Sequence, residues 1–357
     1  MYVQRLECRL FRCLEDVVFE PEPGLNCIRG GNAQGKTSLL EAVLFAATSK
    51  SHRTNVESEL PQYGAEQFQL RLRARRETGE VDIESRWFRG AKRIMVNGVP
   101  QARLSDLLGR VNVVFFSPEG VDLVKGGAAQ RRRFLDMAIS QVQPAYLAAL
   151  QMYRQALRQR NELLRAAQPD HDHIAVWDAQ LAQYGAVMTA QRAAFIEALS
   201  DHAARAYAQI ADAEPLALDY APDVRPEESI AAVLERSRAS DIKRRVTQRG
   251  PHRDDFTALV DARPARAHAS QGQQKSVALA IKLAELALAR QRVGEYPVLM
   301  LDEVLAELDA QRARRLLDAI DPRVQCLITT TELEDRYSFR DAGCAMFRIE
   351  RGRLEKE

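Results

Sequence analysis

The sequence predicts an α/β protein whose mixed sheet and helices are interrupted by an inserted α-helical arm. Short strand-like segments fill the first 120 residues and return after residue 245, whereas residues 121–244 are largely helical. A glycine-rich loop also lies between a strand and a helix near the start of the chain. We therefore divide the chain into a split α/β domain, residues 1–120 and 245–357, and a helical insertion, residues 121–244.

The composition is that of a globular protein, with 46% hydrophobic and 28% charged residues among 357. It excludes a disordered or collagen-like chain. No apolar run approaches the roughly 20 residues that cross a bilayer, and the first residues lack the apolar core of a signal peptide. We expect no membrane partner. Five cysteines without a C-x-x-C pair favour a reducing, cytoplasmic location.

Apolar patterning predicts the strands of the first part in chain order. Alternation marks strands at 3–10, 14–19, 25–28, 68–75 and 81–88. Asn97-Gly98 then marks a tight hairpin, which makes this part a β-rich subdomain. The continuous apolar run at 111–116 predicts a strand buried on both faces, and so do the runs at 296–301 and 324–329.

The helical insertion carries two seams of apolar residues at alternating steps of three and four. One runs from Tyr146 to Leu164, interrupted by Arg160, and the other from Ile174 to Phe195. This spacing is typical of coiled coils. With a break near Pro169 between the seams, we expect a short antiparallel helical hairpin. Two ordinary bundle helices are the alternative.

The glycine-rich loop matches G-x-x-x-x-G-K-[ST] and stands between a strand and a helix, as that motif requires. Its backbone N–H groups close around phosphate oxygens, and the helix N-terminus adds positive potential. We expect Lys36 to reach the β- and γ-phosphates of ATP and the Thr37 hydroxyl to bind Mg²⁺. The expected nucleotide-binding residues here are Gly30, Gly31, Asn32, Ala33, Gln34, Gly35, Lys36, Thr37 and Ser38.

A second element of the site is an apolar strand that ends in Asp302-Glu303. Ligands of open α/β sheets bind at this end of a strand. We expect Asp302 to hold Mg²⁺ together with Thr37, partly through water, and Glu303 to polarise the attacking water. Lys36, Asp302 and Glu303 form the predicted catalytic set. Two acids after a strand are usually a solvated turn, but the phosphate loop argues against that reading.

Residues 270–275 read Ser-Gln-Gly-Gln-Gln-Lys and precede a long helix. Locally they form a capping box of Ser270 and Gln273. Because they lie upstream of the paired carboxylates, they resemble the signature motif of ABC-type ATPases, and residues 307–309 are similar to the D-loop. The resemblance implies an ABC-type P-loop ATPase head, in which Ser270, Gly272 and Gln273 of one subunit close on the γ-phosphate held by another.

Within that class, the chain resembles the bacterial RecF family over nearly its whole length. The motifs that carry this resemblance are Leu10-Phe11-Arg12, Gln34-Gly35-Lys36-Thr37 with Leu40-Glu41-Ala42, Ser51-His52-Arg53-Thr54, Phe116-Ser117-Pro118-Glu119, Arg131-Arg132-Arg133-Phe134-Leu135-Asp136, Ser270-Gln271-Gly272-Gln273-Gln274-Lys275 and Gly250-Pro251-His252-Arg253-Asp254-Asp255. The last is the most diagnostic, because general ABC ATPases lack it.

The resemblance implies an ATP-dependent homodimer that clamps gapped or junction duplex DNA and, with RecR and RecO, promotes the loading of RecA. It also implies that Arg12 and Arg53 lie near the nucleotide, with simple surface charge as the alternative for both. The role of His252 stays open between structure and nucleotide contact.

The chain departs from the family pattern at several positions. Ala33 replaces a common glycine, and Ser38 replaces the usual asparagine. No glutamine follows Phe116, so Glu119 is the candidate replacement for the Q-loop residue, and residues 329–331 (Thr-Thr-Thr) occupy the place of the switch histidine. The two absences predict slow hydrolysis, with ATP acting as a dimerisation switch.

A net charge of +2 first argues against nucleic acid as a partner, but the distribution of charge reverses that inference. Residues 236–253 hold seven basic side chains against one acidic. Such stripes are usually solvated faces, whereas on an ATPase clamp we expect them to neutralise phosphates. The candidate DNA-binding residues are Arg71, Arg73 and Arg75 on one strand face, Arg154 and Arg158 on one helix face, and Lys243, Arg244 and Arg245.

Two other classes compete with a DNA-repair ATPase. One is the ATP-binding subunit of a membrane transporter, but the stretch between Thr37 and Ser270 is longer than a compact subunit needs. The other is a structural protein of the SMC type, but the predicted arm is far too short for a chromosome-bridging coiled coil.

Overall fold

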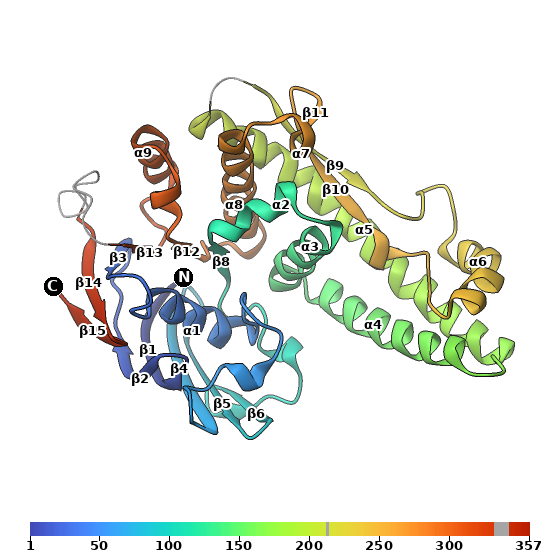
Figure 1. Ribbon diagram of the computed structural model, residues 1–357, viewed down its shortest axis with the longest axis horizontal. Helices are drawn as coiled ribbons and strands as arrows, with labels where there is room; N and C mark the ends of the chain where they lie inside the picture. The colour runs from blue at the N-terminus through green and yellow to red at the C-terminus, as the bar shows by residue number, and fades with distance from the viewer. Residues whose placement is uncertain (212–213, 332–342) are drawn as a thin grey trace. The chain divides into compact units, whose positions relative to one another are not determined.

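The computed structural model describes residues 1–211, 214–331 and 343–357, which fall into two compact units (Figure 1). Unit 1 comprises Met1–Gly120, Gln209–Asp212 and Lys282–Glu357, and unit 2 comprises Val121–Ala208 and Ala213–Ile281. The predicted return to the α/β domain at residue 245 differs from this division. Residues 245–281 group with the helices because β10 pairs with β9, a strand of the insertion itself.

The central sheet of unit 1 has the strand order β15-β14-β3-β13-β12-β8. Its neighbours are parallel except for the hairpin of β14 and β15. Every residue of β12 is buried, as the continuous apolar run predicts. The strands are β3 (Leu25–Arg29), β8 (Val113–Phe116), β12 (Val298–Asp302), β13 (Cys326–Thr330), β14 (Ala345–Glu350) and β15 (Arg353–Lys356).

A second, antiparallel sheet in unit 1 has the order β2-β1-β4-β5-β6-β7. Its residues alternate between buried and exposed, most regularly in β4, because one face packs on the core and the other meets water. The strands are β1 (Tyr2–Phe11), β2 (Leu14–Phe19), β4 (Gln67–Arg76), β5 (Gly79–Phe88), β6 (Ala91–Val96) and β7 (Val99–Pro100).

Helices complete unit 1. Helix α1 (Lys36–Thr48) is buried along almost its whole length and contacts both sheets. Such a helix is apolar on all sides, which the run Leu39–Ala47 provides. The remaining elements are η1 (Glu57–Glu59), η2 (Leu104–Asp106), η3 (Pro118–Val121, which continues into unit 2), η5 (Val304–Glu307) and α9 (Ala310–Ala319). The predicted mixed α/β fold with a β-rich part is confirmed.

Unit 2 is built on the long helices α4 (Pro144–Arg165) and α5 (His171–Ile210), which run side by side as the expected hairpin (Figure 1). Pro144 occupies the first helical position, where its missing N–H is harmless. Most seam residues are buried, including Tyr153 and Leu181. Arg160, the charged residue that interrupts the apolar seam, is also fully buried.

The other elements of unit 2 surround this hairpin. A small sheet has the order β11-β10-β9, and the end of α6 lies beside α4. Helix α8 (Gln271–Val293) begins in unit 2 and ends in unit 1. Within the described residues, no helix is long and apolar enough to span a membrane. The elements are α2 (Asp122–Lys125), α3 (Ala128–Val142), β9 (Leu216–Ala221), α6 (Ile230–Arg244), η4 (Pro251–Arg253), β10 (Asp255–Val260), β11 (Arg263–Pro264) and α7 (Ala265–His268).

Candidate functional site

The phosphate-loop motif borders a cleft of about 1090 Å³ in unit 1. The loop connects β3 to α1, and β12 brings its terminal carboxylate to the same edge of the sheet. Gly30 and Gly31 do not line the cleft, but their carbonyl oxygens accept hydrogen bonds from the Lys36 ammonium group. The predicted site residues that line it are Arg12, Asn32, Ala33, Gln34, Gly35, Lys36, Thr37, Ser38, Arg53, Asp302 and Glu303.

The loop is held in shape by the turn between β14 and β15. A Cβ on Gly30 would lie 2.3 Å from the carbonyl oxygen of Ile349, so only glycine fits there. The N–H of Gly352 donates to the Gln34 carbonyl oxygen at 2.9 Å, and the N–H of Arg351 donates to Gln34 Oε1 at 2.7 Å. The phosphate loop therefore depends on residues more than 300 positions later in the chain.

Ala33, the departure from glycine, has φ of 61°, in the left-handed region. A Cβ makes that conformation cost about 1–2 kcal/mol. The family's usual glycine would adopt it freely. The substitution thus leaves the loop in its required shape but adds local strain.

Lys36, Thr37 and Asp302 meet at the base of the cleft. The Lys36 ammonium donates to the carbonyl oxygens of Gly30 and Gly31 at 2.7 and 2.9 Å. Thr37 Oγ1 lies 3.2 Å from Asp302 Oδ1. These contacts bring together a fixed cation and two hard oxygen ligands.

Thr329, which occupies the place of the switch histidine, contacts both predicted carboxylate residues. Its hydroxyl donates to Asp302 Oδ1 at 2.6 Å and accepts from the N–H of Glu303 at 2.9 Å. It lies at the same level of the sheet as Asp302, because β12 and β13 are paired in parallel with these two residues opposite each other. Thr329 thus orients both carboxylate residues.

Glu303 lies beside Lys36, with Oε1 3.1 Å from the ammonium nitrogen. Burial raises the pKa of Asp302, and the nearby charges of Glu303 and Glu119 raise it further. The oxygens of Thr37 and Asp302 are the hard donors that suit Mg²⁺, so these residues fit the predicted metal.

Arg12 and Arg53 converge on Glu41, a fully buried residue of α1. Arg12 makes a two-pronged contact with the Glu41 carboxylate at 2.8 and 3.0 Å, and it donates to the Glu59 carbonyl oxygen. Arg53 lies 3.8 Å from the same carboxylate, and Ser51 donates to it. Glu41 was not among the predicted site residues; a charge inside an otherwise apolar helix was the available signal.

His52 and Glu119 complete the wall of the cleft. The His52 ring packs on Phe115 with centroids 4.3 Å apart, and burial lowers the pKa of His52 to about 4. Ser117 donates to Glu119 at 2.6 Å, and this hydrogen bond lowers the pKa of the Glu119 carboxyl. At neutral pH the wall therefore presents a neutral imidazole and a negative carboxylate.

The residues expected to act on a second nucleotide, Ser270, Gly272 and Gln273, belong to unit 2 and do not line this cleft. The capping box is confirmed. The N–H of Ser270 donates to Gln273 Oε1 at 2.8 Å, and the N–H of Gln273 lies 3.2 Å from Ser270 Oγ. Gln273 also donates to Glu214 at 2.6 Å.

The Gly-Pro-His-Arg-Asp-Asp run lies partly inside unit 2, with Gly250, Pro251 and Asp254 buried and Arg253 exposed. His252 Nδ1 lies 2.7 Å from Tyr153 Oη, and Nε2 lies 3.1 Å from the Thr247 carbonyl oxygen. Asp254 accepts from the buried Arg192 at 2.8 Å. Both ring nitrogens of His252 are engaged, which gives this histidine a structural role.

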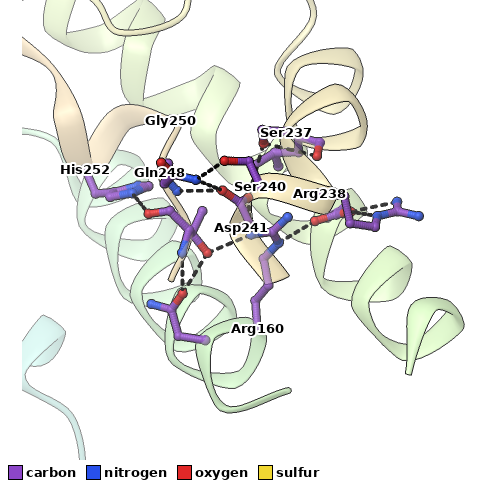
Figure 2. Close-up of polar contacts among 12 residues, drawn as sticks. Arg160, Ser237, Arg238, Ser240, Asp241, Gln248, Gly250 and His252 are labelled. Carbon is purple, nitrogen blue, oxygen red and sulfur yellow. Dashed lines mark hydrogen bonds and ion pairs between the residues drawn. The ribbon is translucent and has the colours of Figure 1, made fainter. Parts of the chain in front are cut away.

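A buried polar network joins α4, α5 and α6 (Figure 2). Arg160, fully buried, donates to Asp178 at 2.5 Å and to Asp241 at 2.8 Å. Asp241 also accepts from the N–H of Gln248, and Arg160 donates to Thr247. The network fixes the C-terminal turn of α6, which carries the exposed Lys243, Arg244 and Arg245.

The candidate DNA-binding cations differ in how they are paired. On β4, Arg71 and Arg73 face Asp82 at 2.7 and 3.8 Å, and Arg75 faces Glu80 at 3.3 Å. Arg154 is paired with Asp136 at 2.7 Å. The side chains of Arg158 and of residues 243–245 are exposed and form no ion pair with the described residues. The charges of Arg71, Arg73 and Arg75 on β4 are therefore largely neutralised. The excess positive charge lies on Arg158 and on residues 243–245.

Comparison with known proteins gives consistent matches over the whole chain. The model of the RecF/RecN/SMC N terminal domain matches residues 2–351. "DNA replication and repair protein RecF" of Symbiobacterium thermophilum is 40% identical, covering 94% of this chain and 92% of that protein. The same-named protein of Halalkalibacterium halodurans is 37% identical, with both chains fully covered.

Solved structures give the same result. The structure described as "the recombination mediator protein RecF-ATP in RecFOR pathway" superposes with a TM-score of 0.92 at 32% identity, covering 100% of this chain and 97% of that one. An Smc head bound to a domain of ScpA matches with a TM-score of 0.58 at 18% identity, which shows a shared fold. With its phosphate loop, its paired carboxylates and these full-length matches, the chain belongs to the RecF family.

Proposed function

We propose that this chain is an ATP-gated DNA-binding protein of recombinational repair, with weak ATPase activity that DNA stimulates. The observation that carries the proposal is the cleft, in which Lys36, Thr37, Asp302 and Glu303 converge on one phosphate-binding loop. A relative with a TM-score of 0.92 is described with ATP, which supports ATP as the ligand here.

In the proposed reaction, each residue has a defined task. Lys36 and the loop N–H groups bind the β- and γ-phosphates. Thr37, and Asp302 partly through water, would hold Mg²⁺, which would neutralise phosphate charge. Glu303 accepts the proton of the attacking water, and its Oε1 lies 3.1 Å from the Lys36 ammonium nitrogen. Thr329 holds Asp302 and the Glu303 backbone in place.

ATP acts in this proposal as a dimerisation switch. Ser270, Gly272 and Gln273 lie at the start of the long helix α8, where N–H groups and the helix dipole attract an anion. In an ATP-dependent homodimer they would close on the γ-phosphate in the cleft of the partner. We expect slow hydrolysis because Thr329 occupies the place of the switch histidine, which would contact the γ-phosphate. The Thr329 hydroxyl donates instead to Asp302.

The proposed partner is gapped or junction duplex DNA, with RecR, RecO and RecA as further partners by resemblance, in the cytoplasm. The unpaired cations of the arm support a phosphate-binding surface. Because aromatic residues do not accompany these cations, backbone contacts would outweigh reading of base sequence.

Gel filtration tests the switch. ATP is expected to shift the wild-type chain to a dimer, whereas Lys36→Met should stay monomeric because the β- and γ-phosphates lose their cation. Lys125→Met, which removes an exposed lysine, is the matched control and should dimerise normally. A Lys36→Met protein that dimerises like the wild type with ATP would refute the switch.

A further inference from the structure

We infer that Tyr63 stacks on the base of the bound nucleotide and favours purines over pyrimidines. The inference rests on the proposed ATP site and extends it from the phosphates to the base. It starts from a surface residue that neither the motifs nor the proposed reaction uses.

Tyr63 lies on the part of the cleft wall formed by residues 58–65, beside Arg12. Its side chain is fully exposed (104%), more than any other large hydrophobic residue described. It forms no hydrogen bond, ion pair or ring contact with the described residues. An aromatic ring over a cleft with no packing partner of its own is available to a ligand.

The backbone that carries this ring is firmly anchored. The N–H of Arg12 donates to the Leu60 carbonyl oxygen at 2.8 Å, and the N–H of Gln62 donates to that of Leu10 at 2.8 Å. Leu60 is fully buried. The ring can therefore turn about its side-chain bonds while its attachment to the cleft wall stays fixed, which lowers the entropy lost on stacking.

The two parts of the cleft wall differ in chemistry. Lys36, Thr37 and the carboxylates of Asp302 and Glu303 suit phosphates and a metal ion. Residues 58–65 offer an aromatic ring, Pro61 and Ala65 and contain no lysine or arginine, although they include Glu59, whose carbonyl oxygen accepts from Arg12. A nucleotide has the same polarity, with charged phosphates at one end and a flat base at the other. Stacking on a base is worth about 1–3 kcal/mol, and purines offer the larger face.

Titration calorimetry of the full chain with Mg²⁺ tests the inference, using ATP, CTP and inorganic tripolyphosphate as ligands. Tyr63→Ala is expected to weaken ATP about tenfold, to weaken CTP less, and to leave tripolyphosphate unchanged, because tripolyphosphate has no base. Tyr63→Phe should bind ATP like the wild type, since it keeps the ring. Val56→Ala, which trims another exposed side chain, is the matched control and should change nothing.

Each outcome has a separate meaning. Equal ATP affinity of Tyr63→Ala and the wild type would overturn the stacking role, and so would an equal loss for ATP and tripolyphosphate. Normal ATP affinity with impaired dimerisation or DNA binding would assign the ring to a macromolecular partner and also overturn it. A wild-type chain that binds neither ATP nor tripolyphosphate would instead refute the proposed function itself.

Discussion

The cleft of unit 1 and the interior of unit 2 use the same charged residue types for opposite purposes. In unit 2, Arg160 and Arg192 are enclosed; both donate to aspartates, and Arg192 also donates to the Pro251 carbonyl oxygen. In unit 1, Lys36, Asp302 and Glu303 contact one another but line an open cleft. The enclosed set positions helices, whereas the open set remains available for ligand. Access to a cleft, more than residue type or burial, separates functional charge from structural charge, because Lys36 and Asp302 are buried like Arg160 but border the cleft.

The largest expected effect is the loss of an enclosed cation. Arg160→Met should lower the free energy of unfolding by about 3–5 kcal/mol, because it leaves Asp178 and Asp241 buried without this partner. Urea unfolding followed by circular dichroism measures this. Arg158→Met, two residues earlier and exposed, should change stability by no more than about 0.5 kcal/mol. Equal losses in the two variants would remove the distinction between enclosed and open charge.

Removing an open charge should affect reaction rather than stability. Glu303→Gln keeps the size of the side chain but cannot accept a proton, so ATP hydrolysis should fall by about 10²–10⁴-fold. Unfolding should change little, since Glu303 is partly exposed. A phosphate-release assay is the measurement, with Glu355→Gln on β15 as the exposed control. Unaltered hydrolysis in Glu303→Gln would exclude it as the general base.

His52 is an intermediate case, because it borders the cleft and is largely buried. Its folded-state pKa of about 4 lies below the usual value of 6.5, so the unfolded chain takes up the proton first as the pH falls. The low pKa of His52 contributes its full share to the free energy of unfolding above about pH 6.5. This contribution is lost as the pH falls toward 4, and roughly 2 kcal/mol of it is lost at pH 5. Unfolding of the wild type and of His52→Phe at pH 7 and pH 5 measures it. The variant should lose less stability than the wild type; an equal loss would assign the acid sensitivity to other groups.

The two groups of candidate DNA-binding cations extend the comparison to the surface. Replacing Lys243 and Arg245 with alanine should reduce the slope of log K against log salt by about 0.9 for each DNA phosphate that is no longer neutralised. Replacing Arg71 and Arg75 should change it less, because their charges are already paired on β4 and β5. Fluorescence anisotropy with gapped duplex DNA across a salt series is the measurement. A larger effect from the strand pair would move the binding surface to unit 1.

The smallest expected effect concerns the strained phosphate loop. Ala33→Gly should relieve the left-handed conformation at φ of 61°, while the greater freedom of glycine in the unfolded chain offsets part of the gain. A net stabilisation of at most about 1 kcal/mol is expected, measured by thermal unfolding. Destabilisation would mean that the Ala33 methyl group makes contacts that outweigh the strain.

Local sequence patterns predicted the parts of the site that are local in structure. The phosphate loop, the strand ending in Asp302 and the Ser270 capping box can each be recognised from a few neighbouring residues, although the turn at residues 351 and 352 holds the loop in shape. The roles of Glu41, Thr329 and Arg160 were missed because each depends on partners far away in the chain, such as Arg12 for Glu41. The predicted division at residue 245 differs from the division into compact units for the same reason, since the pairing of β10 with β9 is set by tertiary contacts.

The position of β3 in the central sheet has a consequence for synthesis of the chain. Its two neighbours, β13 and β14, come from beyond residue 325, and the turn that holds the phosphate loop lies at residues 351 and 352. A nascent chain on the ribosome therefore exposes both edges of β3 through almost all of translation. Unpaired edges invite association with other chains. Chaperone protection of the emerging N-terminal segment should therefore limit such association until β13 and β14 have been synthesised.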